Sequence, residues 1–284
     1  MKTIGFIDYY ISEWHANNYP KWIKEASGKV GCEFKVGYVY AELDISPVDG
    51  VSTDEWCDKF GAERCGSISE LCERADYICI LSPSNPEKHL EYAKEAFKCG
   101  KPTYVDKTFA ENLSSAREIF SLGEKYGTPF FSSSALRYAE ELSELSCPEC
   151  AVIIGPGSNF DEYIIHLLEI TVKLFGTHPV RIKAENQGKN QSILRLELEG
   201  GRVASIAFSP SAPYSVICEK EDGTTVCKAI QPGFFPSLIE SILRFYLTGK
   251  VPFSGEETLA VMKIRDGALK AHREPDRWIS LGEQ

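Results

Sequence analysis

Strand-like and helix-like segments alternate through residues 1–133 of this chain. The strand-like runs are apolar along their whole length, which is typical of strands that are buried on both faces. Such runs separated by amphipathic helices predict a parallel sheet with helices on both sides, so we expect a Rossmann-like, doubly wound α/β domain here. The expected strands are residues 3–8, 34–40, 77–81, 102–105 and 129–132, and the expected helices are residues 19–27, 54–61, 69–74, 86–99 and 114–126.

The pattern changes after residue 136. A helix is expected at 160–175, and the β-rich runs that follow alternate between apolar and polar residues and are joined by glycine-containing turns. That alternation indicates a mainly antiparallel sheet with one open face. With helices expected at 235–248 and 255–271, the sequence predicts a second, α+β domain over residues 134–284. The alternating runs are residues 180–185, 192–199, 202–209, 214–219 and 224–230.

Charge and hydropathy argue against two classes of partner. The formal net charge is −10 and the basic residues form no cluster, whereas a nucleic-acid surface needs clustered cations. No run approaches the roughly 20 apolar residues of a membrane helix, and the apolar run at the N-terminus is broken by Asp8 before it reaches signal-peptide length. We therefore expect a cytoplasmic protein that binds neither nucleic acid nor membrane.

The ten cysteines show no repeating spacing. The one suggestive pair is Cys147 and Cys150, separated by two residues. A zinc ribbon would need a second such pair, and a redox motif would need a thioredoxin-like context. We expect no metal site, and most of the thiols to be small buried apolar groups or incidental surface groups.

Several short motifs follow one another in an order that resembles a known family. Residues 77–83 read YICILSP, residues 105–108 read VDKT, and residues 162–169 read EYIIHLLE. His89, the GKP at 100–102, the SGEET at 254–258 and the RWISL at 277–281 complete the series. Together these motifs resemble the glucose–fructose oxidoreductase / inositol dehydrogenase (Gfo/Idh/MocA) family.

The resemblance implies an NAD(P)-dependent oxidoreductase that transfers hydride between a nicotinamide cofactor and a sugar, inositol or related polyol. It implies that Lys107 lies beside the nicotinamide and the reacting carbinol, with Glu162 and His166 facing it from the second domain. A histidine can remove the hydroxyl proton, and a lysine can stabilise the developing alkoxide. Arg137 and Tyr163 are the expected substrate contacts.

Each of these residues also has a plainer explanation when it is taken singly. Lys107 alone would be a solvated surface lysine, and His166 alone would be a core histidine inside an apolar stretch. Glu162 alone would be a helix-start carboxylate that interacts with the helix dipole. Arg137 could pack in a domain interface instead of contacting a substrate. The motifs in their order, rather than any one residue, favour a shared pocket.

The expected phosphate-binding turn departs from the family pattern. A dinucleotide-binding turn normally reads G-x-G-x-x-G so that the backbone can approach the pyrophosphate. Here Asp8, Tyr9, Tyr10 and Ser12 occupy the turn, and the one nearby glycine, Gly5, lies inside the expected strand. The tyrosine rings would fill the space of the pyrophosphate, and Asp8 and Glu13 would add like charge beside an anionic ligand.

Other expected cofactor contacts are Ser82, Pro83, Asp106 and Lys107. Glu42 ends the second strand, where a carboxylate binds a ribose hydroxyl and disfavours a 2′-phosphate, so NAD is expected rather than NADP. Two smaller departures from the family pattern occur in other motifs. Asp106-Lys107-Thr108 stands where the family has Glu-Lys-Pro, and Glu162 stands where the family's helix motif begins with aspartate.

The unusual turn leaves alternatives open. The chain could be a degenerate family member without dinucleotide binding that binds a small ligand or serves as a partner subunit. It could also be a non-redox lyase or hydrolase that uses the same cleft, because fold does not determine function. By analogy with the family, we expect a homodimer or homotetramer that associates through the open face of the C-terminal sheet.

Overall fold

A computed structural model describes residues 1–145, 148–188 and 191–282. The chain forms two compact units, which are described separately: unit 1 is Met1–Ser133 with Pro236–Phe253, and unit 2 is Ser134–Phe235 with Ser254–Gln284. The first boundary coincides with the expected division after residue 133. The segment Pro236–Phe253 differs from the expected contiguous split, because it lies in unit 1.

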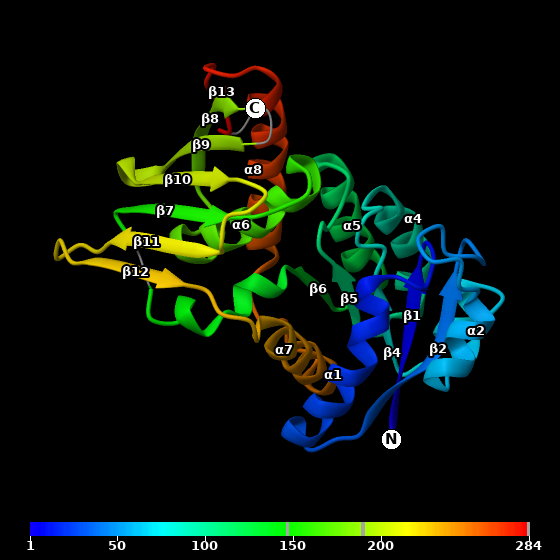
Figure 1. Ribbon diagram of the computed structural model, residues 1–284. Helices are drawn as coiled ribbons and strands as arrows, with labels where there is room; N and C mark the ends of the chain where they lie inside the picture. The colour runs from blue at the N-terminus through cyan, green and yellow to red at the C-terminus, as the bar shows by residue number, and fades with distance from the viewer. Residues whose placement is uncertain (146–147, 189–190, 283–284) are drawn as a thin grey trace. The chain divides into compact units, whose positions relative to one another are not determined.

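Unit 1 is built on a six-stranded parallel sheet in the order β3-β2-β1-β4-β5-β6. The expected doubly wound α/β domain is therefore confirmed (Figure 1). Its strands are β1 (Lys2–Asp8), β2 (Phe34–Ala41), β3 (Glu63–Arg64), β4 (Tyr77–Ile80), β5 (Thr103–Asp106) and β6 (Phe130–Ser133). Its helices include α1 (Trp14–Val30), α2 (Thr53–Phe60), α3 (Ile68–Arg74), α4 (Glu87–Ala96), the 3-10 turn η1 (Phe97–Cys99) and α5 (Leu113–Tyr126).

The strand order reverses between β1 and β4, and in sheets of this kind ligands bind at the carboxyl ends of the strands beside such a reversal. Gly5 in β1 is a packing residue, because a Cβ there would lie 2.4 Å from a methyl carbon of Leu71 in α3. The glycine nearest to the phosphate turn is thus needed for α3 to approach the sheet, and it does not belong to the turn.

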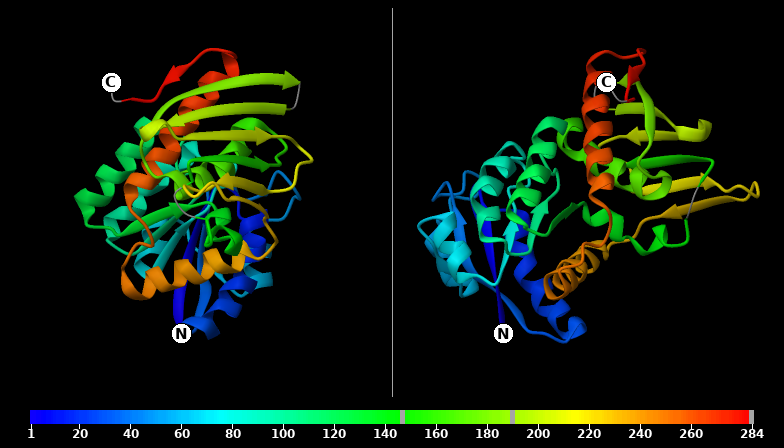
Figure 2. Two further views of the ribbon diagram at one scale, coloured as in Figure 1. Left: turned by 90° about the vertical axis from the view of Figure 1, so that its left-hand side faces the viewer. Right: turned by 180° about the vertical axis from the view of Figure 1, so that it is seen from behind.

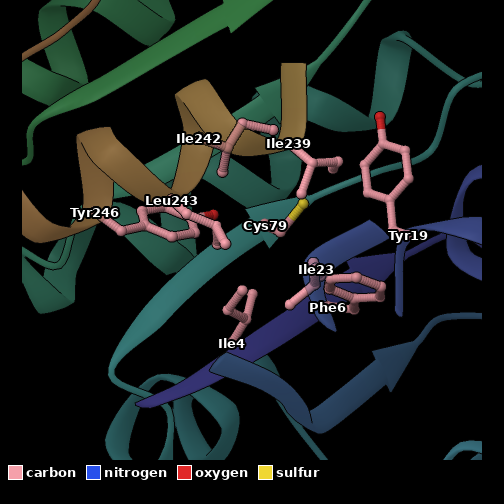
Figure 3. Close-up of a pocket in the computed structure, with 9 residues that line it drawn as sticks. All are labelled: Ile4, Phe6, Tyr19, Ile23, Cys79, Ile239, Ile242, Leu243 and Tyr246. Carbon is pink, nitrogen blue, oxygen red and sulfur yellow. The ribbon is translucent and has the colours of Figure 1, made fainter. Parts of the chain in front are cut away.

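Helix α7 (Phe234–Thr248) covers the opposite face of the unit 1 sheet together with α1. The hydroxyl of Tyr246 donates to the carbonyl of Ile78 at 2.6 Å, and its ring stacks on Tyr77 at a centroid distance of 4.7 Å. A small apolar cavity remains between these elements (Figure 3). It is lined by Ile4, Phe6, Tyr19, Ile23, Cys79, Ile239, Ile242, Leu243 and Tyr246. Burial of this apolar face is the reason that α7 belongs to unit 1 although it follows the second sheet in sequence.

Unit 2 contains a seven-stranded sheet in the order β12-β11-β7-β10-β9-β8-β13. All neighbouring strands are antiparallel except β7 and β10, so the expected α+β fold is confirmed (Figure 2). Strand β7, between two strands that come later in sequence, was not expected. The strands are β7 (Cys150–Gly155), β8 (Pro179–Gly188), β9 (Gln191–Leu198), β10 (Val203–Phe208), β11 (Ser215–Glu219), β12 (Thr225–Ala229) and β13 (Ile279–Ser280).

Two long helices, α6 (Phe160–Phe175) and α8 (Gly255–Arg273), pack in unit 2 against each other and against this sheet. Buried residues alternate with more exposed ones along β7, β9, β10 and β11, as the sequence pattern predicted. Short 3-10 turns complete the unit: η2 (Ala135–Tyr138), η3 (Glu140–Leu142) and η4 (Glu199–Gly201). Among the described helices of both units, none is long and apolar enough to span a membrane.

Candidate active site

The carboxyl ends of β1 and β4 are tied together by the side chain of Asp8. Its Oδ1 accepts hydrogen bonds from the backbone N–H of Tyr9 at 2.7 Å and of Ser82 at 3.1 Å. The Ser82 hydroxyl lies 3.3 Å from the same oxygen, accepts from the Tyr9 N–H at 2.9 Å, and belongs to a residue with a φ of 52°. The turn after β1 is therefore held by a buried carboxylate where a dinucleotide-binding turn has glycines.

Burial and the nearby charge of Glu13 raise the pKa of Asp8 well above its ordinary value. The Asp8 side chain is 1% exposed, and its Oδ2 has no hydrogen-bond partner among the described residues. A raised carboxyl pKa means that the folded state binds the proton more tightly than the unfolded state does. The contribution of Asp8 to stability is then complete below the ordinary carboxyl pKa, and it is lost as the pH rises through the raised value.

Asp8→Asn is expected to raise the free energy of unfolding at pH 8 by about 1–3 kcal/mol, because a neutral amide replaces a buried charge that the raised pKa shows to be unfavourable. Near pH 4 it should have little effect, because asparagine imitates the protonated acid. Denaturation at both pH values measures the difference. Asp76→Asn is the matched control: hydrogen bonds from Thr3 and Lys2 outweigh partial burial and lower the Asp76 pKa, so that substitution should be destabilising at pH 8. A loss of stability in Asp8→Asn at pH 8 would contradict the expectation.

The N-terminus of α1 is capped by the carboxylate of Glu13. It accepts from the backbone N–H of His15 at 2.8 Å and of Ala16 at 2.5 Å, and it lies 3.1 Å from the Nδ1 of His15. Glu13 is 9% exposed. In dinucleotide-binding Rossmann domains, the amides at this helix end bind the pyrophosphate. With Glu13 in this position, a pyrophosphate would have to compete for these amides with the chain's own carboxylate.

The other residues of the turn also make contacts within unit 1. The Ser12 hydroxyl donates to Asp49 at 2.7 Å, and the rings of Tyr9 and Tyr10 meet edge to face at 6.1 Å. Side chains therefore occupy the turn where a phosphate-binding turn has glycines, as the sequence predicted. Whether Tyr9, Tyr10 and Ser12 contact a cofactor stays a prediction.

Glu42, just after β2, is bound by two neighbouring side chains. The Lys88 ammonium donates at 2.7 Å and the Tyr92 hydroxyl at 2.9 Å. Partial burial acts to raise the pKa of Glu42, but the hydrogen bonds from Lys88 and Tyr92 outweigh it, so the net effect lowers the pKa. The residue is therefore an ionised carboxylate at the strand end, which is the state that a ribose hydroxyl requires of its acceptor.

The end of β5 brings Asp106 and Lys107 to the same edge as Ser82 and Pro83. Lys107 is 8% exposed, and its ammonium donates to the carbonyl of Pro83 at 3.0 Å. The Oδ1 of Asp106 accepts from the hydroxyls of Tyr104 at 3.2 Å and Tyr19 at 3.4 Å. A solvated surface lysine is thereby excluded, and the fold holds the Lys107 ammonium at the carboxyl edge of the sheet.

His89, which contributed to the family resemblance, is fully buried. Its ring nitrogens lie 2.5 Å from the carbonyl of Leu81 and 3.1 Å from that of Phe109. Burial lowers its pKa, although the hydrogen bonds to the Leu81 and Phe109 carbonyls act in the opposite direction. It joins the loop after β4 to the loop after β5, and thus positions Pro83 and Lys107 relative to each other.

In unit 2, Glu162, Tyr163 and His166 lie half-buried on α6. The Nδ1 of His166 lies 2.8 Å from the hydroxyl of Ser134. Glu162 accepts from the side-chain amide of Asn159 at 3.1 Å, and Asn159 caps the helix. Ser134 was missed in the sequence, where only the serine run 132–134 beside the domain boundary could have drawn attention to it. His166 is not fully buried, so the alternative of an enclosed core histidine is excluded.

Arg137 makes ion pairs inside unit 2. Its Nε lies 2.5 Å from Glu169 and its Nη1 lies 2.7 Å from Glu257. The ammonium of Lys173 donates to the Arg137 carbonyl at 2.5 Å. Burial acts to lower the pKa of Arg137, but the charges of Glu169 and Glu257 outweigh it and raise the pKa. Arg137 thus joins η2 to α6 and α8, and a role in binding substrate stays a prediction.

Of the suggestive cysteine pair, Cys147 lies outside the described residues, and Cys150 is exposed at the start of β7. Among residues 1–145, 148–188 and 191–282, no cluster of histidine, cysteine, aspartate or glutamate is arranged to hold a metal ion.

Two comparisons of the sequence with known proteins identify similar oxidoreductases. Residues 48–131 match the model of the Gfo/Idh/MocA oxidoreductase family with an NAD-binding Rossmann fold, a segment that begins after the altered turn. An uncharacterized oxidoreductase of Escherichia coli, YhhX, is 29% identical over 103 residues, which span 34% of this chain and 29% of that relative's length.

Solved structures match over nearly the whole chain. A probable dehydrogenase from Thermotoga maritima has a TM-score of 0.80 at 14% identity, with 98% of each chain covered. A scyllo-inositol dehydrogenase from Lactobacillus casei, with NAD(H) and scyllo-inositol bound, has a TM-score of 0.77 at 12% identity, with 99% of each chain covered. The resemblance expected from the sequence is therefore confirmed within residues 48–131, where the chain is similar to the Gfo/Idh/MocA oxidoreductases, and over nearly its whole length the chain shares the fold of these two dehydrogenases.

Proposed function

We propose that this chain is an NAD(P)-dependent oxidoreductase that transfers hydride between a nicotinamide cofactor and a sugar, inositol or related polyol. The observation that carries the proposal is the buried ammonium of Lys107, held at the carboxyl edge of a Rossmann sheet beside Pro83 and Asp106. Similarity to inositol and sugar dehydrogenases supports the substrate class. Nicotinamide, when bound, accepts or supplies the hydride.

The proposed roles of the side chains follow from their chemistry. Lys107 donates a hydrogen bond to the reacting oxygen and stabilises the negative charge that develops on it. His166 takes up the hydroxyl proton during oxidation and returns it during reduction. Ser134 holds the Nδ1 side of the His166 ring, so that proton exchange occurs at Nε2. Glu162 favours the charged imidazolium, and Tyr163 contacts the substrate.

The ionised carboxylate of Glu42 supports NAD rather than NADP. A 2′-phosphate at this strand end would meet like charge, whereas a ribose hydroxyl can donate to the carboxylate. Lys88 neutralises part of that charge. We therefore expect a preference for NAD without complete exclusion of NADP.

Glu13→Ser is expected to tighten the binding of NADH by about tenfold, which corresponds to about 1.4 kcal/mol. The substitution removes the carboxylate from the amides of α1, and serine remains a good helix cap. Isothermal titration of both proteins with NADH measures the change. Glu55→Ser is the matched control, because it removes an equal charge from the first turn of α2. If Glu13→Ser bound NADH more weakly than the native protein, Glu13 would be part of the cofactor site rather than its competitor.

The proposed function is tested by titrating NAD, NADH, NADP and NADPH into the purified protein, followed by a panel of sugars and inositols. Binding of one cofactor pair at micromolar concentration, with turnover of at least one polyol, is the expected result. Absence of binding at millimolar cofactor in both the native protein and Glu13→Ser would overturn the proposal and would favour a member without dinucleotide binding.

We also propose that the protein is cytoplasmic and assembles into a homodimer or homotetramer through the open face of the unit 2 sheet. Val152, Ile154, Ile193 and Ile217 lie on the strand positions that alternate with the buried ones, and they are half-buried within the single chain. A sheet face carrying such residues is suited to a partner surface. Light scattering during size-exclusion chromatography distinguishes these assemblies from a monomer.

A further inference from the structure

Cys72 and Cys99 lie side by side in unit 1, although they belong to different helical segments. Cys72 is in the last turn of α3, and Cys99 ends η1. The sulfur of Cys99 lies 3.0 Å from the carbonyl oxygen of Ala96, and the sulfur of Cys72 lies 3.9 Å from the same atom. The two sulfur atoms therefore share one neighbour, the Ala96 carbonyl oxygen, and each lies within 4 Å of it.

The two thiols differ in exposure. Cys72 is 4% exposed, whereas Cys99 is half-buried at the end of η1 and can be reached from solvent. Small oxidants therefore reach Cys99 first. Cys72 is the more buried of the two and lies on the same carbonyl oxygen.

The two thiols also differ in their electrostatic surroundings. The hydrogen bond from Cys72, the backbone N–H of Lys101 and the Lys101 charge outweigh burial and lower the pKa of Cys99 to about 6. That lysine is held in place, because its ammonium donates to the carbonyls of Cys72 at 2.5 Å and Ala75 at 2.6 Å. The hydrogen bond to Cys99 and burial raise the pKa of Cys72. A reactive cysteine is a partly exposed thiolate near a cation, which describes Cys99.

We propose that Cys72 and Cys99 are an oxidative modification site that closes reversibly to a disulfide. The Cys99 thiolate attacks hydrogen peroxide, forms a sulfenic acid and releases hydroxide, which takes a proton to become water. The Cys72 thiol then attacks the sulfenic sulfur, and its proton leaves with the hydroxyl group as a second water. Two thiols are oxidised by two electrons and one peroxide is reduced. A dithiol reductant reverses the reaction by thiol–disulfide exchange.

The bond would join the C-terminal turn of α3 to the segment that leads into β5, and none of its atoms belongs to the proposed cofactor or substrate residues. A cross-link between these positions removes conformations from the unfolded chain, so the oxidised protein is expected to melt roughly 5 °C higher than the reduced protein. Because this shift does not depend on nicotinamide binding, the proposal can be tested whether or not the protein is a dehydrogenase.

The full-length protein is treated with hydrogen peroxide, its remaining thiols are alkylated, and it is digested with trypsin for mass spectrometry. The expected product is a cross-link between peptides 65–74 and 99–107 that disappears after reduction with dithiothreitol. Cys65 shares the first peptide with Cys72, so the experiment is repeated in Cys65→Ser. The cross-link should persist there, whereas its loss would assign the bond to Cys65 and overturn the proposal.

Replacing one cysteine at a time with serine tests the roles assigned to Cys99 and Cys72. In Cys72→Ser, Cys99 should still react with peroxide and should proceed to the sulfinic acid, because no resolving thiol remains. In Cys99→Ser, Cys72 should remain reduced. Cys32 is half-buried like Cys99, so Cys32→Ser serves as the matched control and should keep the native cross-link. Alkylation of Cys99 at pH 7 no faster than that of Cys32, together with no cross-linked peptide, would overturn the proposal.

Discussion

Lys107→Met is expected to lower kcat by about 10²–10³-fold with whichever polyol the panel identifies. A single donor aimed at a developing oxyanion contributes on the order of 10²–10³ in kcat when the site is preorganised. The Lys107 ammonium is preorganised, because burial and its bond to the Pro83 carbonyl restrict it at the edge of the sheet. Methionine keeps most of the apolar stem, so the change chiefly removes the charge. Steady-state kinetics with saturating cofactor measures the effect.

The control separates loss of chemistry from loss of structure. Lys94→Met changes an exposed lysine of α4 that pairs with Glu118, and it should leave kcat within about twofold of the native value, because exposed pairs contribute little. The melting temperature of Lys107→Met should stay close to that of the native protein. If Lys107→Met kept more than a tenth of the native kcat, the proposed role of this ammonium would be wrong.

Arg137→Ala is expected to lower the free energy of unfolding by about 3–5 kcal/mol, the typical cost of removing one partner from a buried ion pair. The substitution removes the guanidinium that pairs with Glu169, which is 5% exposed. It also removes the connection to Glu257 and the side chain that joins η2 to α6 and α8. Urea denaturation followed by circular dichroism measures the loss.

Two further variants decide how this result is explained. Arg181→Ala removes an exposed pair with Glu197 and should cost less than about 1 kcal/mol. Arg137→Met combined with Glu169→Leu removes both charges of the shorter pair and should recover part of the stability lost in Arg137→Ala. If Arg137→Ala left stability unchanged but raised the KM for the substrate, Arg137 would act mainly as a substrate contact.

Much of the fold was accessible from local patterns. Apolar strands alternating with helices predicted the doubly wound sheet, and period-two runs predicted the antiparallel sheet, because each pattern reports which faces of an element must be buried. The helix of α7 was also expected, since its own residues carry the periodicity. The packing of α7 in unit 1 was not expected, because it depends on the apolar face that β1, β4 and α1 form together.

Some features of the candidate site could likewise be predicted from the sequence, and others could not. The motif order identified Lys107, His166 and the altered turn, since these stand out in the sequence itself. Their surroundings were not accessible, because Ser134 beside His166, and Glu169 and Glu257 around Arg137, are contacts between residues distant in sequence. The sequence likewise did not reveal that Cys72 and Cys99 lie on the same carbonyl oxygen, that of Ala96.

The sequence by itself thus determined the fold class, the family resemblance and the absence of a glycine-rich turn, because composition, periodicity and turn chemistry are local properties of the chain. Only the tertiary structure decided what replaces the missing glycines and which charges are neutralised. Those outcomes depend on distances between atoms that the chain brings together only when its apolar faces are buried.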